Sequence, residues 1–262
     1  SNVGAAKVAA KMPDQVFYDG VRRFGYGSVP HSGFPGESGG VVLRPARWSG
    51  TTKTTMSYGY GLNVTPLQIA TAYSALANGG RLIAPTFVKG QRNEGQQIID
   101  ENVARQVVAM METVVTQGGA KQAAVLGYRV AGKTGTARKA GPGGYERGHY
   151  NALFAGVVPA TNPRFATVIV INDPQAGKFY GGLVSAPVYH NVMEGTLRLM
   201  DVPLDDLQSW LAAQQSGKVG HSASILPAPP AETALPVDAA AEFDAALPSA
   251  HAQTPPTTGG TQ

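Results

Sequence analysis

The sequence predicts an α+β domain in which helices pack against an antiparallel sheet. Two apolar runs, residues 152–158 and 165–171, are joined by a linker too short for a crossover, so they should pair as an antiparallel hairpin. Helical spacing precedes and follows these runs instead of alternating with them. The 33 Gly and 19 Pro, with only 15% charged residues, favour many turns over a coiled coil or a charged helical bundle.

The first helix is predicted over residues 65–77. Thr65 is a good N-cap, and Pro66 fits the first helical position, where a backbone N–H is not needed. Apolar residues then recur at helical spacing until residues 78–80, Asn-Gly-Gly, end the helix. Both boundaries are therefore predicted from local signals.

A second helix is predicted over residues 101–116, and Gly118 and Gly119 end it. Its apolar residues recur every three or four positions, so they share one face of the helix. These residues are Val103, Val107, Met110 and Val114.

The spacing of the apolar residues then changes from the helical period to the period of two that is typical of strands. Residues 128–137 alternate weakly, and with the two apolar runs they complete a predicted sheet of three strands. Residues 185–187, Ser-Ala-Pro, are predicted to cap a closing helix. The apolar residues of that helix are Val188, Val192, Met193, Leu197 and Met200.

Composition divides the chain into a domain over residues 1–205, a linker over 206–220 and a tail over 221–262. The tail is rich in Ala and Pro and lacks apolar periodicity, so we predict that it is disordered. No Lys or Arg follows Lys218, so the body of the chain is more basic than the formal net charge of +4 indicates. The basic residues are scattered rather than interleaved with aromatics, so no nucleic-acid partner is predicted.

Several functional classes are excluded by what the 262 residues lack. The absence of Cys excludes disulfide frameworks, thiolate metal sites and thiol nucleophiles. The five His show no metal-ligand spacing, so we predict no metal site. No apolar run approaches 18 residues, so we expect no membrane-spanning helix and no direct membrane contact by this chain.

Residues 127–134 fit the pattern G-x-x-x-x-G-K-[ST] of nucleotide-binding P-loops. A P-loop opens directly into a helix, because the amides of the helix N-terminus hold the phosphates. The residues after Thr134 are rich in Gly and will not hold a helix, and Tyr128, Arg129 and Val130 are bulky for a loop that wraps phosphate. A P-loop NTPase is therefore the minor alternative.

The same lysine begins the string Lys-Thr-Gly-Thr on a predicted strand. At the edge of a sheet, the Lys133 ammonium and the Thr134 hydroxyl can hold a substrate carboxylate. Gly135 leaves the strand bare, so a substrate backbone can pair along it, and the Thr136 N–H can donate to an oxyanion. The string belongs to a set of motifs in serine acyl-transferases, and by itself it occurs by chance.

Other segments occur with this string in one order and at plausible intervals. They are residues 1–4, 34–37, 57–61, 65–68, 133–137, 172–174 and 181–187. Together they closely resemble the transpeptidase domain of class B penicillin-binding proteins, and the resemblance covers residues 1–203. Residues 155–178 look most like the division-specific, septal enzymes of Gram-negative bacteria.

The resemblance implies the penicillin-binding protein and β-lactamase-like transpeptidase fold, in an incomplete form. The family's S-x-x-K motif, which holds the serine nucleophile and its lysine base, occurs nowhere in the 262 residues. Ser1 and Asn2 resemble the last two residues of the S-x-N motif. A T-x-x-K string at residues 136–139 lies on the predicted strand, where its side chains cannot share one helical face. The N-terminal part of the fold, with its nucleophile, is therefore expected outside this chain.

The resemblance also implies roles for individual residues. Asn2 should contact the substrate amide. Lys133, Thr134 and Gly135 should bind the carboxylate of the substrate or of a β-lactam, and the Thr136 N–H should supply half of the oxyanion hole. The residues that should form the aromatic and basic rim around the substrate are Tyr58, Tyr60, Arg138, Tyr150, Phe179 and Tyr180.

The function implied is that of a peptidoglycan D,D-transpeptidase in septal cell-wall synthesis, at the periplasmic face of the inner membrane. Its expected partners are stem peptides ending in D-Ala-D-Ala, β-lactam antibiotics and, through the N-terminal region, membrane proteins of the division machinery. No cofactor is implied. The alternative is a non-catalytic binding fragment. We expect the chain alone to be inactive, and unstable or aggregation-prone because its sheet edges are unpaired.

Overall fold

The computed structural model describes residues 1–141 and 144–216. The predicted tail over 221–262 lies outside these residues. The helices are α1 (Asn2–Ala10), α2 (Asp14–Arg23), α3 (Thr52–Met56), α4 (Pro66–Ala77), α5 (Glu101–Thr116), α6 (Gly181–Leu199) and α7 (Leu207–Gln215), with 3₁₀ helices η1 (Pro45–Arg47) and η2 (Lys121–Ala123). The strands are β1 (Val41–Val42), β2 (Leu62–Asn63), β3 (Arg81–Ile83), β4 (Gly95–Gln97), β5 (Ala131–Gly141), β6 (Gly144–Val158) and β7 (Phe165–Asn172).

The main sheet has three antiparallel strands in the order β5-β6-β7, which confirms the predicted hairpin and the α+β class. Lys133 of β5 lies opposite Ala155 of β6, and Ala155 lies opposite Val168 of β7. Within residues 1–141 and 144–216, no further strand pairs with the outer side of β5. The strand that carries the Lys-Thr-Gly-Thr string is therefore an edge strand.

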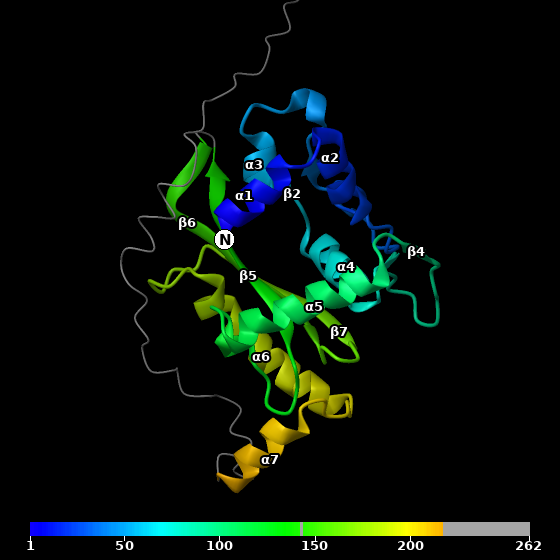
Figure 1. The fold of residues 1–262 in the computed structure, drawn as a ribbon, viewed down its shortest axis with the longest axis vertical. Helices are drawn as coiled ribbons and strands as arrows, with labels where there is room; N and C mark the ends of the chain where they lie inside the picture. The colour runs from blue at the N-terminus through cyan, green and yellow to red at the C-terminus, as the bar shows by residue number, and fades with distance from the viewer. Residues whose placement is uncertain (142–143, 217–262) are drawn as a thin grey trace, which may run out of the picture.

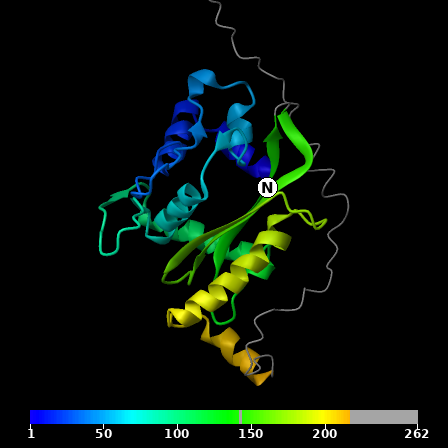
Figure 2. The same ribbon diagram turned by 180° about the vertical axis from the view of Figure 1, so that it is seen from behind.

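Helices cover both faces of this sheet. Figure 1 shows α5 across the near face, and Figure 2, from behind, shows α6 across the other. One buried cluster joins α6 to the sheet through Phe154, Tyr189 and Met193. A second, smaller cluster joins α5 to β5 and β6 through Val108 and Ala131. The sheet that contains this edge strand therefore lies between helix α5 on one face and helix α6 on the other.

Both helices predicted before the sheet are present with the predicted bounds. Thr65 caps α4 in a full capping box with Gln68, and Asp100 caps α5. The face that α5 buries is different from the apolar stripe read from the sequence, because Val103 and Met110 are 48% and 60% exposed. The buried residues are Ala104, Val108 and Val115. Small Ala104 has no exposed surface, so a face that includes it can pack closely on the domain.

The closing helix begins five residues earlier than predicted, because its N-cap is Tyr180 and not Ser185, so the expected cap at Ser185 is wrong. Helix α6 starts at Gly181 and holds Pro187 in its interior, although Pro cannot donate the backbone hydrogen bond there. Ser185 is completely buried inside the helix. Tertiary packing decides the start, because Gly181 and Gly182 have no side chains and lie directly against backbone of the sheet and of Gly119.

The structure also has elements that the sequence did not predict. Two small sheets, β1 with β2 and β3 with β4, lie within the helical first half. Helix α7 lies within residues 206–220, the stretch predicted to be a linker. The Asp206 side chain caps α7, and the Asp206 N–H donates to the carbonyl of Gly127 at 3.0 Å, so this stretch is attached to the domain. The domain boundary at residue 205 stays a prediction.

A buried amide side chain holds the loops of the first half together. The Nε2 group of Gln68 donates to the carbonyls of Gly25, Ser28 and Gly39 at 3.3, 2.8 and 2.8 Å. Its Oε1 atom accepts from the N–H of Thr65 at 2.8 Å. Gln68 is buried, so water cannot replace these bonds without a rearrangement of the loops.

We expect Gln68→Ala to lower the free energy of unfolding by about 2–4 kcal/mol, because it leaves three carbonyls of half-buried loop residues without donors and removes half of the capping box. The control is Gln208→Ala on the exposed side of α7, which should change that free energy by less than about 0.5 kcal/mol. Urea denaturation of the full-length protein that carries this chain measures both. Equal effects of the two substitutions would contradict the structural role of Gln68.

Candidate active site

The backbone of β5 offers hydrogen-bond donors along its outer edge. The N–H of Arg138 donates to the hydroxyl of Tyr60 at 3.1 Å, which shows that this N–H points away from β6. Along an extended strand the N–H direction alternates, so the N–H groups of Thr136 and Thr134 point to the same outer edge. An extended peptide could therefore pair along β5 at these positions.

The side chains of Lys133 and Thr134 meet at this edge. The Lys133 ammonium donates to the carbonyl of Thr134 at 2.9 Å and lies 3.5 Å from its hydroxyl oxygen. Desolvation by the surrounding protein lowers the pKa of Lys133, although part of the side chain stays exposed. An ammonium and a hydroxyl this close form a pair of donors suited to a carboxylate. The geometry thus brings together the two groups that the sequence singled out.

Thr136 connects the edge strand to helix α6. Its hydroxyl oxygen accepts from the N–H of Gly181 at 3.1 Å. A Cβ atom on Gly181 would lie 2.6 Å from the carbonyl oxygen of Gly135 and closer still to that of Leu153. The start of α6 therefore rests on the backbone of β5 and β6, behind the Lys-Thr-Gly-Thr string. On the other face, the Leu153 side chain lies against Gly135, 2.7 Å from where a Cβ would be.

Three of the predicted rim residues form one aromatic stack. The rings of Tyr150 and Phe179 are parallel within 11°, with centroids 4.2 Å apart. The Phe179 and Tyr180 rings follow at 4.4 Å. Burial raises the pKa of Tyr180, whose hydroxyl has no hydrogen-bond partner among the described residues. The stack joins β6 to the chain just before α6, residues almost 30 positions apart in sequence.

Two further rim residues lie in a second aromatic group. Tyr58 and Tyr60 make an edge contact at 6.1 Å, and Tyr60 makes another with Tyr145 of β6 at 5.0 Å. Tyr60 is buried, and desolvation raises its pKa. The nearby Tyr150 adds to this effect, so the two aromatic groups lie near each other. Sequence reasoning missed Tyr145, because no motif marks it.

Asn2 lies apart from this arrangement. It is the first residue of α1, which Ser1 caps by accepting from the N–H of Gly4. Its side chain is exposed, and in the described part of the chain it makes no hydrogen bond to β5. Helix α1 and the β5–β6 hairpin do lie at the same end of the molecule (Figure 1). The predicted contact of Asn2 with a substrate amide stays a prediction.

Sequence reasoning also missed the ion pair between His149 and Asp173. The two oxygens of the Asp173 carboxylate lie 3.0 Å from Nδ1 of His149. His149 lies within β6, directly before Tyr150 of the aromatic stack, and Asp173 directly follows β7. The signal in the sequence was the Asn-Asp-Pro string at 172–174, one of the segments that carry the resemblance, and nothing in it pointed to His149.

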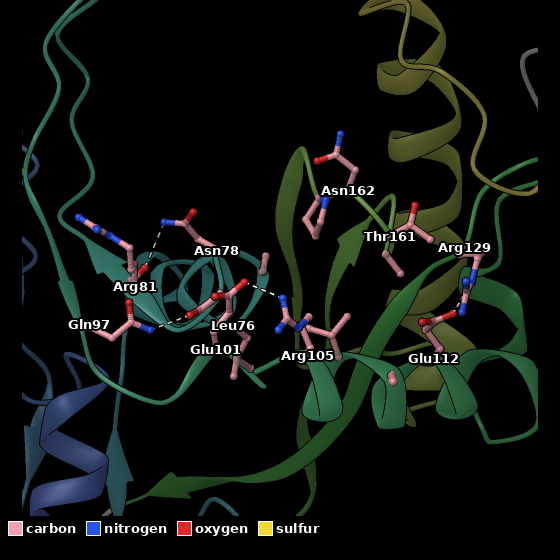
Figure 3. Close-up of a pocket in the computed structure, with 16 residues that line it drawn as sticks. Leu76, Asn78, Arg81, Gln97, Glu101, Arg105, Glu112, Arg129, Thr161 and Asn162 are labelled. Atoms are coloured by element: carbon pink, nitrogen blue, oxygen red, sulfur yellow. Dashed lines mark hydrogen bonds and ion pairs between the residues drawn. The ribbon is translucent and has the colours of Figure 1, made fainter. Parts of the chain in front are cut away.

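A cavity of about 660 Å³ lies elsewhere, between the α4–β3 turn, α5 and the β6–β7 turn. Figure 3 shows two ion pairs among its charged groups, Arg105 with Glu101 at 2.6 Å and Arg129 with Glu112 at 2.8 Å. None of the predicted site residues lines it. The candidate site is therefore the edge of β5 and not this cavity.

Other kinds of site find no support in residues 1–141 and 144–216. No group of three or more His, Asp or Glu side chains there could hold a metal ion. Lys133 and Thr134 lie within strand β5 and do not start a helix, so the P-loop geometry is absent. None of the helices within these residues has the length and apolar character needed to cross a membrane.

Comparison with known proteins gives consistent matches. The family model of the penicillin-binding protein transpeptidase domain matches residues 1–194. The chain is 47% identical over 230 residues to the peptidoglycan D,D-transpeptidase FtsI of Escherichia coli K12, and this match covers 85% of the chain and 39% of FtsI. The probable peptidoglycan D,D-transpeptidase PbpC of Pseudomonas aeruginosa is 39% identical over 210 residues, 79% of the chain and 37% of PbpC. The chain thus spans about two fifths of the length of these relatives.

Solved structures similar to this chain come from penicillin-binding proteins as well. The apo transpeptidase domain of penicillin-binding protein 3 from Burkholderia pseudomallei superposes with a TM-score of 0.72 at 39% identity, covering 78% of this chain and 63% of that one. Penicillin-binding protein 3 of Mycobacterium tuberculosis, solved in complex with aztreonam, has a TM-score of 0.72 at 32% identity, with 78% and 50% covered. The β5-β6-β7 sheet and its helices therefore have close counterparts in solved structures.

Proposed function

Because this chain belongs to the transpeptidase family of penicillin-binding proteins, we propose that the protein that contains it is a D,D-transpeptidase that cross-links peptidoglycan in septal cell-wall synthesis. The observation that carries the proposal is the exposed edge of β5, where Lys133, Thr134 and outward N–H groups converge. The similarity to FtsI over 85% of the chain supports the septal assignment.

On this proposal, the stem peptide pairs with the edge of β5 and its terminal carboxylate lies between the Lys133 ammonium and the Thr134 hydroxyl. Gly135 leaves the strand without a side chain at the position where the substrate backbone passes. The Thr136 N–H donates to the oxyanion that develops on the carbonyl under attack. Asn2 contacts the substrate amide.

The nucleophile is a serine from a part of the protein outside these 262 residues, which contain no Ser-x-x-Lys. Its oxygen attacks the carbonyl of the D-Ala-D-Ala bond, the C–N bond breaks, and the terminal D-Ala leaves with a proton. An amine of a neighbouring stem peptide then attacks the acyl-enzyme ester and releases the serine. The chain alone is accordingly inactive.

The aromatic and basic residues around the edge form the wall of the site on this proposal. They are Tyr58, Tyr60, Arg138, Tyr150, Phe179 and Tyr180. Stacked rings present a flat apolar surface to a substrate or β-lactam side chain. A β-lactam acylates the same serine and stays bound; the complex of the Mycobacterium tuberculosis relative with aztreonam supports this class of ligand.

The remaining assignments follow from the proposed reaction. The catalytic domain lies at the periplasmic face of the inner membrane, where the stem peptides are. The N-terminal region, outside this chain, would bind membrane proteins of the division machinery. The similarity to a peptidoglycan D,D-transpeptidase supports the first of these assignments.

The proposal is tested on the full-length protein by adding a β-lactam and measuring the intact mass. We expect one covalent adduct per protein, lost when the serine of the upstream Ser-x-x-Lys is replaced by alanine. The same measurement on residues 1–262 alone should give no adduct. A folded full-length protein that forms no adduct would contradict the proposed reaction.

A further inference from the structure

Residues 173–180, here called the connecting segment, join β7 to α6 and are fastened to the sheet at both ends. At the far end, the N–H of Gly181 donates to Thr136 at 3.1 Å. At the near end, the N–H of Asp173 donates to the carbonyl of Tyr150 at 2.8 Å. Between these anchors, residues 175–178 are exposed. The position of the segment therefore depends on its two ends.

Asp173 makes the turn out of β7 in a conformation that few side chains adopt. Its φ angle is +53°, in the left-handed region, which disfavours residues with a Cβ atom and tolerates Asp and Asn best. Its carbonyl accepts from Nε2 of Gln175 at 3.0 Å. Since this conformation is intrinsically unfavourable, it has to be held by the contacts of Asp173.

The side chain of Asp173 contacts His149. Both carboxylate oxygens of Asp173 lie 3.0 Å from Nδ1 of His149. The hydrogen bond from His149, with the nearby charges of His149 and Lys139, holds the pKa of Asp173 below its usual value against the effect of desolvation. The carboxylate therefore stays ionised at neutral pH. Lys139 lies near the end of β5, His149 lies within β6, and Asp173 directly follows β7.

The ion pair and the aromatic stack connect the same two stretches of chain. His149 directly precedes Tyr150 in β6, and Tyr150 stacks on Phe179 at 4.2 Å. Asp173 begins the segment that carries Phe179 and Tyr180. Without the contact to His149, the Asp173 side chain would no longer hold the turn, and the near end of the segment would be fixed only by the hydrogen bond from the Asp173 N–H to the carbonyl of Tyr150.

We propose that His149 and Asp173 are positioning residues of the site, whose contact fixes the connecting segment and so holds Phe179 against Tyr150. The proposal rests on the proposed function, in which the stacked rings contact the side chain of a β-lactam or stem peptide. Neither His149 nor Asp173 touches the ligand. Their effect is on the affinity for ligands that reach the stack and not on the chemical step.

The test uses the full-length protein and aztreonam, with binding before acylation separated from the acylation step. His149→Ala should weaken the binding before acylation about 2- to 5-fold, the range for an exposed ion pair, with little change in the rate at saturation. Asp173→Asn keeps an acceptor oxygen and tolerates the positive φ, so it should fall between the wild type and His149→Ala. Arg147→Ala, at an exposed residue of β6, is the matched control and should bind as the wild type does.

Separating binding from acylation distinguishes positioning from a general structural effect, because a general loss of structure would lower both the affinity and the rate at saturation. Wild-type affinity combined with wild-type acylation in His149→Ala would overturn the proposal.

Hydrogen exchange provides a readout that needs no activity. Amides of residues 175–180 should exchange about 2- to 5-fold faster in His149→Ala than in the wild type or Arg147→Ala. Unchanged exchange overturns the positioning role even if the protein is not acylated. Absence of an adduct in the wild type would, by contrast, count against the proposed function alone.

Discussion

Lys133→Ala is expected to lower the second-order rate constant of acylation by a β-lactam about 30- to 100-fold. The substitution removes a charge-assisted hydrogen bond to the ligand carboxylate in a site where the ammonium is already partly desolvated. The Thr134 hydroxyl, 3.5 Å away, would remain as a weaker donor. The measurement is the rate of adduct formation by the full-length protein at several β-lactam concentrations.

The control for this substitution is Lys121→Ala, at an exposed lysine of η2 away from the β5 edge, which should change the rate less than about 2-fold. The pH dependence adds a second check. Because desolvation lowers the pKa of Lys133 below the 10.5 usual for lysine, the rate should fall at alkaline pH as the ammonium loses its proton. Lys133→Arg should remove this alkaline loss, since arginine stays charged. An unchanged rate in Lys133→Ala would refute the carboxylate-binding role.

Gly181→Ala is expected to lower the free energy of unfolding by about 2–4 kcal/mol. A methyl group there would overlap the carbonyl oxygens of Gly135 and Leu153, which are backbone atoms of β5 and β6 and cannot rotate away. The start of α6 would have to move off the sheet, and with it the N–H that donates to Thr136. We therefore expect slower acylation as well as lower stability.

Gly195→Ala is the matched control, because it lies in the same helix and no atom is within 4 Å of the added methyl group. Alanine is the better helix former, so this substitution should raise the free energy of unfolding by about 0.5–1 kcal/mol. Urea denaturation of both variants of the full-length protein gives the comparison. Similar changes at the two positions would mean that α6 does not rest on the sheet as described.

The site features that were predicted and that the structure contains depend on signals between residues close together in the sequence. Residues 133–136 lie on a strand because they precede a hairpin whose short linker forces antiparallel pairing. Helix α4 has its predicted bounds because Thr65 and Gly79 act within one turn of the chain. The family was identified from strings of a few residues in a fixed order, and residues 1–194 match its transpeptidase domain.

The predictions that were wrong concern the face that helix α5 buries and the position at which helix α6 begins. The apolar stripe of α5 was assigned one residue away from its buried face, since the large residues counted there include exposed Met110, whereas buried Ala104 is small. The start of α6 was placed at Ser185 because Pro187 usually follows a helix start. Neither error could be corrected from the sequence, because each depends on what the helix packs against.

The sequence by itself determined helices α4 and α5, the three antiparallel strands with the Lys-Thr-Gly-Thr string, and the family, because turn, cap and strand signals act between residues a few positions apart. Only the tertiary structure decided which distant groups meet. Tyr60 reaches Arg138 across 78 positions, Gly181 reaches Thr136 across 45, and Asp173 reaches His149 across 24. These contacts follow from how closely helices and strands approach, and that distance is set by packing around glycines and buried rings rather than by any local pattern.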